Sequence, residues 1–276
     1  MHTLLIIDPQ NDFCERQGTL FVPGAGEDMQ RLASFVRSAR ERLGEVVVTL
    51  DSHPSVAIER PTFWKRADGR PVEPFTQITH AQAAAGEYAP NDDSLRPQVL
   101  AYLQALESQG RYKLMVWPVH CVIGAWGHNI HGAVLAALGE WEMQVQRGAF
   151  KVLKGQNPLT EQYSAVRAEV PRADDPRTQT NHELIARCRP DSGLLFVAGE
   201  AASHCVAATL EHLFEAFSQQ QIGRVVLLED CMSPVTGFEA NDKACIEAAV
   251  ARGARAMTST QALSEISRNQ AGNSHV

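Results

Sequence analysis

Two side chains that could act as nucleophile and base follow apolar segments of the sequence. Asp8 directly follows the apolar run 3–7, and Cys205 comes shortly after the apolar run 194–198. A thiol between a strand and a helix lies at the positive end of the helix dipole, which favours the thiolate. The small residues before Cys205 allow a sharp turn whose N–H groups could bind an oxyanion. The same segment fits a buried structural cysteine equally well, and Asp8 alone is typical of a turn residue.

A second set of residues could hold a divalent metal ion. Asp51 and His53 are two residues apart at the end of the predicted strand 46–50, so their side chains can point the same way. His120 could be a third ligand, although an isolated histidine of this kind is more typical of a hydrogen-bonded core position. Lys154, if it lies near a cysteine and an aspartate, would stabilise a thiolate and hold the carboxylate in place. Alone it is typical of a surface lysine before a turn.

These residues need a scaffold, and the sequence alternates apolar strands with helical patterns. Continuous apolar strands between helices predict a parallel sheet that is covered on both faces. In such sheets the functional residues gather at the carboxyl ends of the strands, where Asp8, Asp51 and the segment before Cys205 stand. We predict strands at 3–7, 46–50, 113–117, 143–146, 194–198, 225–228 and 255–258, and helices at 28–43, 95–106, 128–138, 205–217 and 238–251.

The predicted organisation is one α/β domain over residues 1–268, with three α/β/α layers around a mostly parallel sheet of about six strands. Segments 54–97 and 167–180 are polar and proline-containing, and they are too long for ordinary connections. We interpret them as insertions that shape a lid or a subunit contact, and we expect a homo-oligomer. Residues 269–276 are expected to form a disordered tail.

Composition excludes several classes of protein. A chain of 276 residues with 44% apolar content can bury a full core, which excludes general disorder. The net charge of -7 disfavours nucleic-acid binding, and no apolar run approaches the ~20 residues of a membrane helix. The N-terminal segment lacks the basic flank and long apolar stretch of a signal peptide, so we expect a cytoplasmic enzyme. No CxxC pair is present, so most of the cysteines should be buried, unreactive thiols.

The order of the motifs resembles the nicotinamidase/isochorismatase-like cysteine hydrolases, and most closely the nicotinamidases. The motifs are D-P-Q-N-D-F, D-S-H-P, W-P-V-H-C, K-G and H-C-V, which begin at Asp8, Asp51, Trp117, Lys154 and His204. The first and third of these are specific, and the resemblance covers residues 3–258. It implies the isochorismatase-like hydrolase fold.

The resemblance also implies a catalytic centre. Asp8, Lys154 and Cys205 would form the triad of the family. The N–H groups of Ala201 and Cys205 would form the oxyanion hole, with a cis peptide bond between Glu200 and Ala201. A non-proline cis bond costs about 3 kcal/mol or more, so its presence would have a functional reason.

A metal site and a substrate pocket follow from the same resemblance. Asp51, His53 and His120 would bind one divalent ion together with waters. Zinc is the expected metal, and iron or manganese would also suit these oxygen and nitrogen ligands. Phe13 and Trp117 would form the aromatic walls that hold a flat ring.

The implied activity is hydrolysis of a linear amide C–N bond in a small-molecule substrate, with nicotinamide to nicotinate and ammonia as the leading reaction. Ala57 stands where nicotinamidases often carry a further histidine, and residues 201–204 depart from their usual run before the cysteine. The alternative is a related hydrolase of another amide, an N-carbamoyl compound or an isochorismate-like ether; the complete metal-ligand set argues against isochorismatase. A non-catalytic binding protein would not need Asp8, Lys154 and Cys205 together.

Overall fold

A six-stranded parallel sheet forms the centre of the molecule. The computed structural model describes residues 1–273, and the strand order in this sheet is β10-β9-β8-β1-β2-β7, with every neighbouring pair parallel. The strands are β1 (His2–Ile7), β2 (Leu43–Asp51), β7 (Phe150–Lys154), β8 (Leu195–Gly199), β9 (Val225–Leu228) and β10 (Arg255–Met257). The predicted α/β class and the six-stranded parallel sheet are confirmed.

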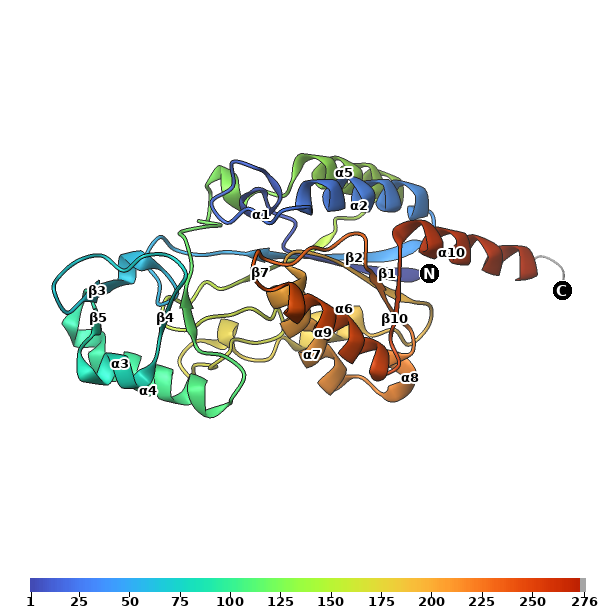
Figure 1. The fold of residues 1–276 in the computed structure, drawn as a ribbon. Helices are drawn as coiled ribbons and strands as arrows, with labels where there is room; N and C mark the ends of the chain where they lie inside the picture. The colour runs from blue at the N-terminus through green and yellow to red at the C-terminus, as the bar shows by residue number, and fades with distance from the viewer. Residues whose placement is uncertain (274–276) are drawn as a thin grey trace.

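Helices cover both faces of this sheet and complete the three layers, as Figure 1 shows. One face is covered by α1 (Asn11–Cys14), α2 (Ala25–Ala39) and α5 (Gly132–Val145). The other is covered by α6 (His182–Cys188), α7 (Ala207–Ala216), α8 (Gln219–Ile222) and α9 (Glu239–Ala251). The last helix, α10 (Ser259–Asn273), packs against α2.

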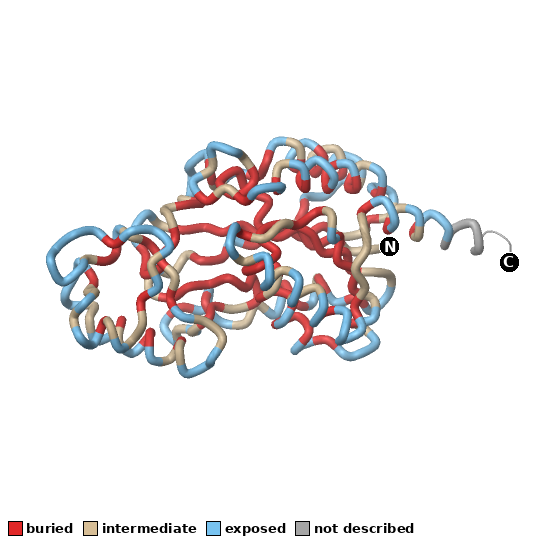
Figure 2. Tube along the Cα trace, in the orientation of Figure 1, coloured by how far each residue is buried: buried red, intermediate tan, exposed pale blue. Residues whose placement is uncertain are grey.

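The central strands are buried because both faces of the sheet carry helices. Leu4, Leu5, Ile6 and Ile7 of β1 have no exposed surface, and every residue of the neighbouring β8 is buried. Figure 2 shows this buried layer running through the middle of the molecule. A strand that contacts helices on both sides gains burial free energy from every side chain, which explains its continuous apolar sequence.

One of the strand predictions was wrong, and another predicted strand lies outside the central sheet. Segment 113–117 contains β6 (Leu114–Val116), but this strand pairs antiparallel with β4 (Thr76–Ile78) outside the central sheet. Segment 143–146 lies at the end of α5, whose apolar positions continue the helical spacing. One edge strand of the central sheet is instead β7, in which exposed and buried residues alternate. Its sequence therefore lacks the continuous apolar run from which the other strands were predicted.

Residues 54–116 form a side lobe next to the sheet, at the left of Figure 1. This lobe has a hydrophobic core of its own, made of residues such as Ile58, Trp64, Val99, Leu103 and Val116. Its elements, besides β4 and β6, are β3 (Trp64–Arg66), α3 (His80–Ala85), β5 (Tyr88–Pro90) and α4 (Arg96–Ser108). Most of the lobe is the segment 54–97 that the sequence predicted to be an insertion.

The chain enters and leaves the side lobe at one place. The His53 N–H donates to the Cys121 carbonyl oxygen at 3.1 Å, and the Ile123 N–H donates back to the His53 carbonyl oxygen at 3.1 Å. The Trp117 N–H donates to the Glu59 carbonyl oxygen at 2.8 Å. These bonds join the two ends of the lobe, so His53 and His120 are held next to each other although many residues separate them.

Two further segments were singled out from the sequence. Segment 167–180 contains one short 3-10 turn (Pro176–Thr178), and the Asp175 carboxylate ties it to Asn157 through a 2.9 Å hydrogen bond. The backbone of α10 continues to Asn273, into the segment predicted to be disordered, and residues 274–276 lie outside the described residues. Within residues 1–273, no helix has the length and apolar character needed to cross a membrane.

Candidate active site

Four polar side chains meet at the carboxyl end of the sheet because of its topology. Along the chain, β2 and β7 follow on one side of β1, and β8 then lies on the other side of β1. The strand order therefore reverses between β1 and β8. Asp8 follows β1, and Cys205 lies beyond the end of β8. Asp51 and Lys154 end β2 and β7, where they are paired in register. Ligands of open parallel sheets bind at this kind of reversal, beyond the strand ends.

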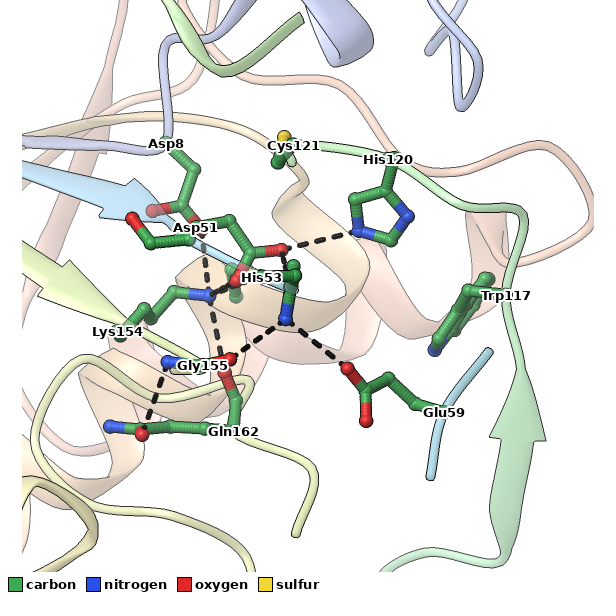
Figure 3. Close-up of polar contacts among 12 residues, drawn as sticks. Asp8, Asp51, His53, Glu59, Trp117, His120, Cys121, Lys154, Gly155 and Gln162 are labelled. Atoms are coloured by element: carbon green, nitrogen blue, oxygen red, sulfur yellow. Dashed lines mark hydrogen bonds and ion pairs between the residues drawn. The ribbon is translucent and has the colours of Figure 1, made fainter. Parts of the chain in front are cut away.

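Lys154 is the centre of a buried cluster of charged groups (Figure 3). Its Nζ lies 3.0 Å from Asp8 Oδ2, 2.8 Å from Asp51 Oδ1 and 3.5 Å from Cys205 Sγ. Asp8 is completely buried, and Lys154 and Cys205 are 2% and 7% exposed. The structure thus brings together the three side chains that the sequence singled out as a triad. Water is largely excluded from the cluster, so electrostatic interactions inside it are strong.

The protonation of this cluster follows from burial and from the Lys154 charge. Burial lowers the pKa of Lys154, but the Asp51, Asp8 and Cys205 side chains reverse the shift and hold that pKa well above its ordinary value. Burial raises the pKa of the Asp8 carboxyl, although the Lys154 ammonium opposes the change. Burial also raises the pKa of the Cys205 thiol, again against the effect of Lys154. A neutral thiol therefore faces a carboxylate whose affinity for a proton is increased, next to a permanent cation.

Asp8 is fixed by the neighbouring strand. The Thr49 hydroxyl of β2 donates to Asp8 Oδ1 at 2.5 Å and accepts from the Asp8 N–H at 3.1 Å. The residue itself has a φ of 44°, in the left-handed region that non-glycine residues rarely adopt. Such conformations cost about 1–3 kcal/mol and concentrate at functional sites. Oδ1 is occupied by Thr49, so Oδ2 remains directed at Lys154.

The turn between β8 and α7 presents Cys205 at the start of a helix. Gly199 has a φ of 117°, and a Cβ at this position would lie 2.0 Å from the Ile7 carbonyl oxygen, so only glycine fits. The Glu200–Ala201 peptide bond is cis, as the resemblance implied. A single π-helical turn, Ala202–Val206, then leads into α7. Cys205 and the amides around it therefore lie at the positive end of a helix.

Asp51, His53 and His120 form the candidate metal centre. One ligand atom from each lies within 4.8 Å of the others, and all three side chains are buried. Asp51 Oδ2 is 2.8 Å from His53 Nε2 and 3.2 Å from His120 Nε2. His53 Nδ1 lies 2.9 Å from the Gly155 carbonyl oxygen and donates to it, which leaves Nε2 facing Asp51. A Cβ at Gly155 would lie 2.5 Å from the His53 ring, so glycine at this position leaves room for the His53 side chain.

The chemistry of these residues fits a divalent cation. Burial and the adjacent Arg60 guanidinium lower the pKa of His120 to about 4, so its imidazole stays neutral. Burial and Arg60 also disfavour protonation of His53, but the Asp51 carboxylate outweighs them and raises its pKa to about 9. The proton of His53 thus occupies the place between Nε2 and Asp51 that a cation would take. One carboxylate and two imidazoles suit zinc, iron or manganese.

A small cavity adjoins both clusters. Phe13 and Trp117, the two aromatic residues that the resemblance implied for a substrate pocket, line it together with Cys205 and the metal-ligand candidates. The Trp117 indole N–H donates to the Tyr163 hydroxyl oxygen at 3.0 Å, which holds the ring in place.

Comparison with known proteins agrees with this geometry. No protein-family model matches the chain. A nicotinamidase from Saccharomyces cerevisiae is 27% identical over 238 residues, which cover 86% of this chain and 89% of the yeast protein. The chain is therefore similar to a nicotinamidase over most of its length. This similarity agrees with the predicted hydrolase of amide C–N bonds.

Solved structures of a nicotinamidase and of a pyrazinamidase share the fold of this chain. A structure of the yeast nicotinamidase superposes with a TM-score of 0.63 at 21% identity, covering 93% of this chain and 99% of the yeast chain. A pyrazinamidase of Pyrococcus horikoshii, in complex with zinc, gives a TM-score of 0.53 at 18% identity and covers 93% and 98% of the two chains.

Several polar residues of the site were missed in the sequence analysis. Thr49 holds Asp8 by hydrogen bonds. The feature of the sequence that could have indicated it is a threonine inside an otherwise apolar strand. Gln10 accepts from the Asp51 N–H at 2.7 Å and donates to the Asp51 carbonyl oxygen at 2.8 Å. Glu59 and Glu161 line the cavity, and burial together with Glu59 raises the pKa of Glu161 to about 8. Both glutamates lie in polar loops, where a charged residue normally indicates solvent exposure.

The alternative candidates in the sequence lie elsewhere. Lys151, a possible substitute for Lys154, is exposed and pairs with Glu142 at 3.3 Å. His128 contacts the Ser52 hydroxyl at 2.8 Å, and His131 caps α5, so neither belongs to the metal-ligand cluster. Cys121 is a completely buried thiol, as predicted. The alternation of faces along β7 explains why Lys151 and Lys154 point to opposite sides of the sheet.

Proposed function

We propose that the chain is a cysteine amidohydrolase that cleaves a small carboxamide through a thioester, with nicotinamide to nicotinate and ammonia as the leading reaction. The main support is the position of Lys154 Nζ, which lies 3.0 Å from Asp8 Oδ2 and 3.5 Å from Cys205 Sγ. A thiol nucleophile, a base and a cation that stabilises both anions are the groups that nucleophilic acyl transfer requires. The nicotinamidase and pyrazinamidase relatives support the choice of substrate.

In the acylation half of this mechanism, the Cys205 thiol gives its proton to Asp8 Oδ2. The sulfur attacks the carbonyl carbon of the amide, and the resulting oxyanion accepts hydrogen bonds from the N–H groups of Ala201 and Cys205. The C–N bond then breaks. The leaving nitrogen takes the proton from Asp8 and departs as ammonia, which leaves a thioester on Cys205.

In the deacylation half, Asp8 accepts a proton from a water molecule as the water oxygen attacks the thioester. The C–S bond breaks, the carboxylic acid is released, and the proton returns from Asp8 to the sulfur. The raised pKa of Asp8 suits this role, because the group must bind and release a proton in each half. Lys154 remains charged throughout and offsets the negative charge that moves between Asp8 and Cys205.

The metal centre would serve binding rather than nucleophilic attack. Asp51, His53 and His120 would hold one divalent ion, for which zinc is the first choice and iron or manganese the alternatives. When bound, the ion supplies a Lewis acid that anchors a ring nitrogen or orients a water molecule. Phe13 and Trp117 would place the ring so that its carboxamide faces Cys205.

Removal of one ligand is expected to remove the metal. Elemental analysis of the wild type should find about one divalent ion per chain, and His53→Ala should lose it, because metal sites rarely retain affinity with two protein ligands. His182→Ala, a change of an exposed histidine in α6, should keep the wild-type content. A wild type that is free of metal and fully active would contradict the metal centre.

Substrate preference provides a second test of the proposal. Nicotinamide should be turned over far better than benzamide, which lacks the ring nitrogen, and Trp117→Ala should raise KM for nicotinamide about tenfold or more through lost ring packing. Trp126→Ala should leave KM unchanged, because that side chain is 45% exposed and does not line the cavity. Equal rates on the two amides, or turnover of a ureido acid alone, would favour the related hydrolases over a nicotinamidase.

A further inference from the structure

His204 lies beside the proposed nucleophile and has no role in the mechanism above. It lines the same cavity as Cys205 and is 8% exposed. Its ring contacts Trp117 edge-on, with ring centroids 5.1 Å apart at 89°, and Phe238 at 4.6 Å and 74°. These contacts fix the orientation of the imidazole within the wall of the pocket.

Hydrogen bonds determine which ring nitrogen carries the proton. The Val235 N–H donates to Ser203 Oγ at 3.1 Å, and this oxygen lies 2.9 Å from His204 Nδ1. No other acceptor contacts the Ser203 hydroxyl within residues 1–273, so its single proton is donated to Nδ1. Nδ1 is therefore an acceptor, and the network assigns the imidazole proton to Nε2. Burial lowers the pKa of His204 to about 4, so the ring is neutral near neutral pH.

The Nε2–H group has no hydrogen-bond partner in the described part of the chain. Among the described residues no acceptor lies within hydrogen-bond distance of this atom, and it is absent from the polar atoms that are both buried and unpaired. It therefore remains accessible from the cavity that its ring lines. A fixed donor in a mostly apolar wall discriminates strongly between ligands, because only a ligand with an acceptor can satisfy it.

We propose that His204 is a specificity-determining residue whose Nε2–H donates a hydrogen bond to an acceptor on the substrate ring next to the carboxamide. This inference rests on the proposed amide hydrolysis and adds a substrate class, namely heteroaromatic carboxamides with a ring nitrogen at that position. We choose this position because His204 directly precedes Cys205, which attacks the carboxamide carbon, and both side chains line the same cavity. Pyrazinamide has a nitrogen there, and nicotinamide has a C–H group.

Binding measurements on a protein that cannot turn over its substrate provide the test. In the metal-loaded Cys205→Ala protein, calorimetry would give Kd for pyrazinamide and nicotinamide, with His204 intact and with His204→Phe. Phenylalanine keeps the aromatic contacts and removes the donor. In the His204→Phe variant, Kd for pyrazinamide should rise about tenfold relative to Kd for nicotinamide. This is the size expected for one hydrogen bond lost in an enclosed site. An unchanged ratio, or equal losses for both amides, would overturn the inference.

A second measurement addresses the donor itself. Nitrogen-15 spectra should show His204 as the tautomer protonated at Nε2, and Ser203→Ala should shift it towards the other tautomer. A ring protonated at Nδ1 in the wild type would overturn the inference whatever the activity. Hydrolysis of both amides by the wild type is assayed in parallel. Missing turnover would contradict the proposed function, whereas an unchanged ratio of dissociation constants would contradict only the role of His204. A Cys205→Ala protein that binds neither amide would overturn both.

Discussion

Replacement of Cys205 by alanine should abolish amide hydrolysis while the fold and the metal content stay unchanged. The substitution removes the sulfur that forms the thioester, and within residues 1–273 no other thiol lines the cavity. Loss of the nucleophile from a catalytic triad lowers kcat by about a millionfold in a comparable hydrolase, so residual ammonia release should approach the background. The measurement is the rate of ammonia release, with circular dichroism and elemental analysis on the same preparation.

Cys188→Ala is the matched control for this variant. Cys188 is also a completely buried thiol, but it lies in α6 and lines no part of the cavity. Its replacement creates a cavity of the same size and should leave kcat within a factor of two or so, because the effect is confined to stability. Substantial activity in Cys205→Ala would show that the covalent mechanism is wrong.

Asp8→Asn should lower kcat by about a thousandfold or more, the range in which general acid–base groups contribute. The amide oxygen of asparagine can still accept the 2.5 Å hydrogen bond from Thr49, so the shape of the site is kept. The proton of Cys205 then has no acceptor, and the leaving nitrogen has no donor. Single-turnover kinetics should show slow acylation, because proton removal precedes attack.

Asp68→Asn makes the same chemical change at an exposed position of the side lobe and should have wild-type kinetics. Differential scanning calorimetry of both variants separates lost catalysis from lost folding. A correctly folded Asp8→Asn protein with a tenth or more of the wild-type kcat would exclude Asp8 as the base.

The sequence was sufficient to predict most strands of the central sheet and the end of the sheet at which the candidate site lies. Apolar strands that are buried on both faces have a distinctive pattern, and Asp8 and Asp51 stood directly after two of them. That rule also explains the failure at β7, where one residue in two is exposed at the sheet edge. Lys154 could be preferred over Lys151 only from the motif spacing, since its partners come from strands far away in the sequence.

The polar residues around the metal-ligand candidates could not be predicted, for a physical reason. Glu59 and Arg60 are buried at 1% and 0% exposure, although charged residues in a polar loop are normally solvated. They are held there by tertiary contacts, such as the hydrogen bond of 2.8 Å from the Arg60 guanidinium to the Pro118 carbonyl oxygen. Contacts between two loops leave no periodic signal in either one. The same holds for His204, whose orientation depends on Ser203 and Val235.

Because of the hydrogen bonds at the base of the side lobe, the geometry of the site does not depend on the length of chain between Glu59 and Trp117. Because the two ends are joined beside His53 and His120, each doubling of the intervening segment would cost only about 0.6 kcal/mol in loop closure. The lobe has its own hydrophobic core, so such changes would be accommodated within it. Evolution can therefore lengthen, shorten or replace this module in proteins of the same fold while the residues at its base keep their places.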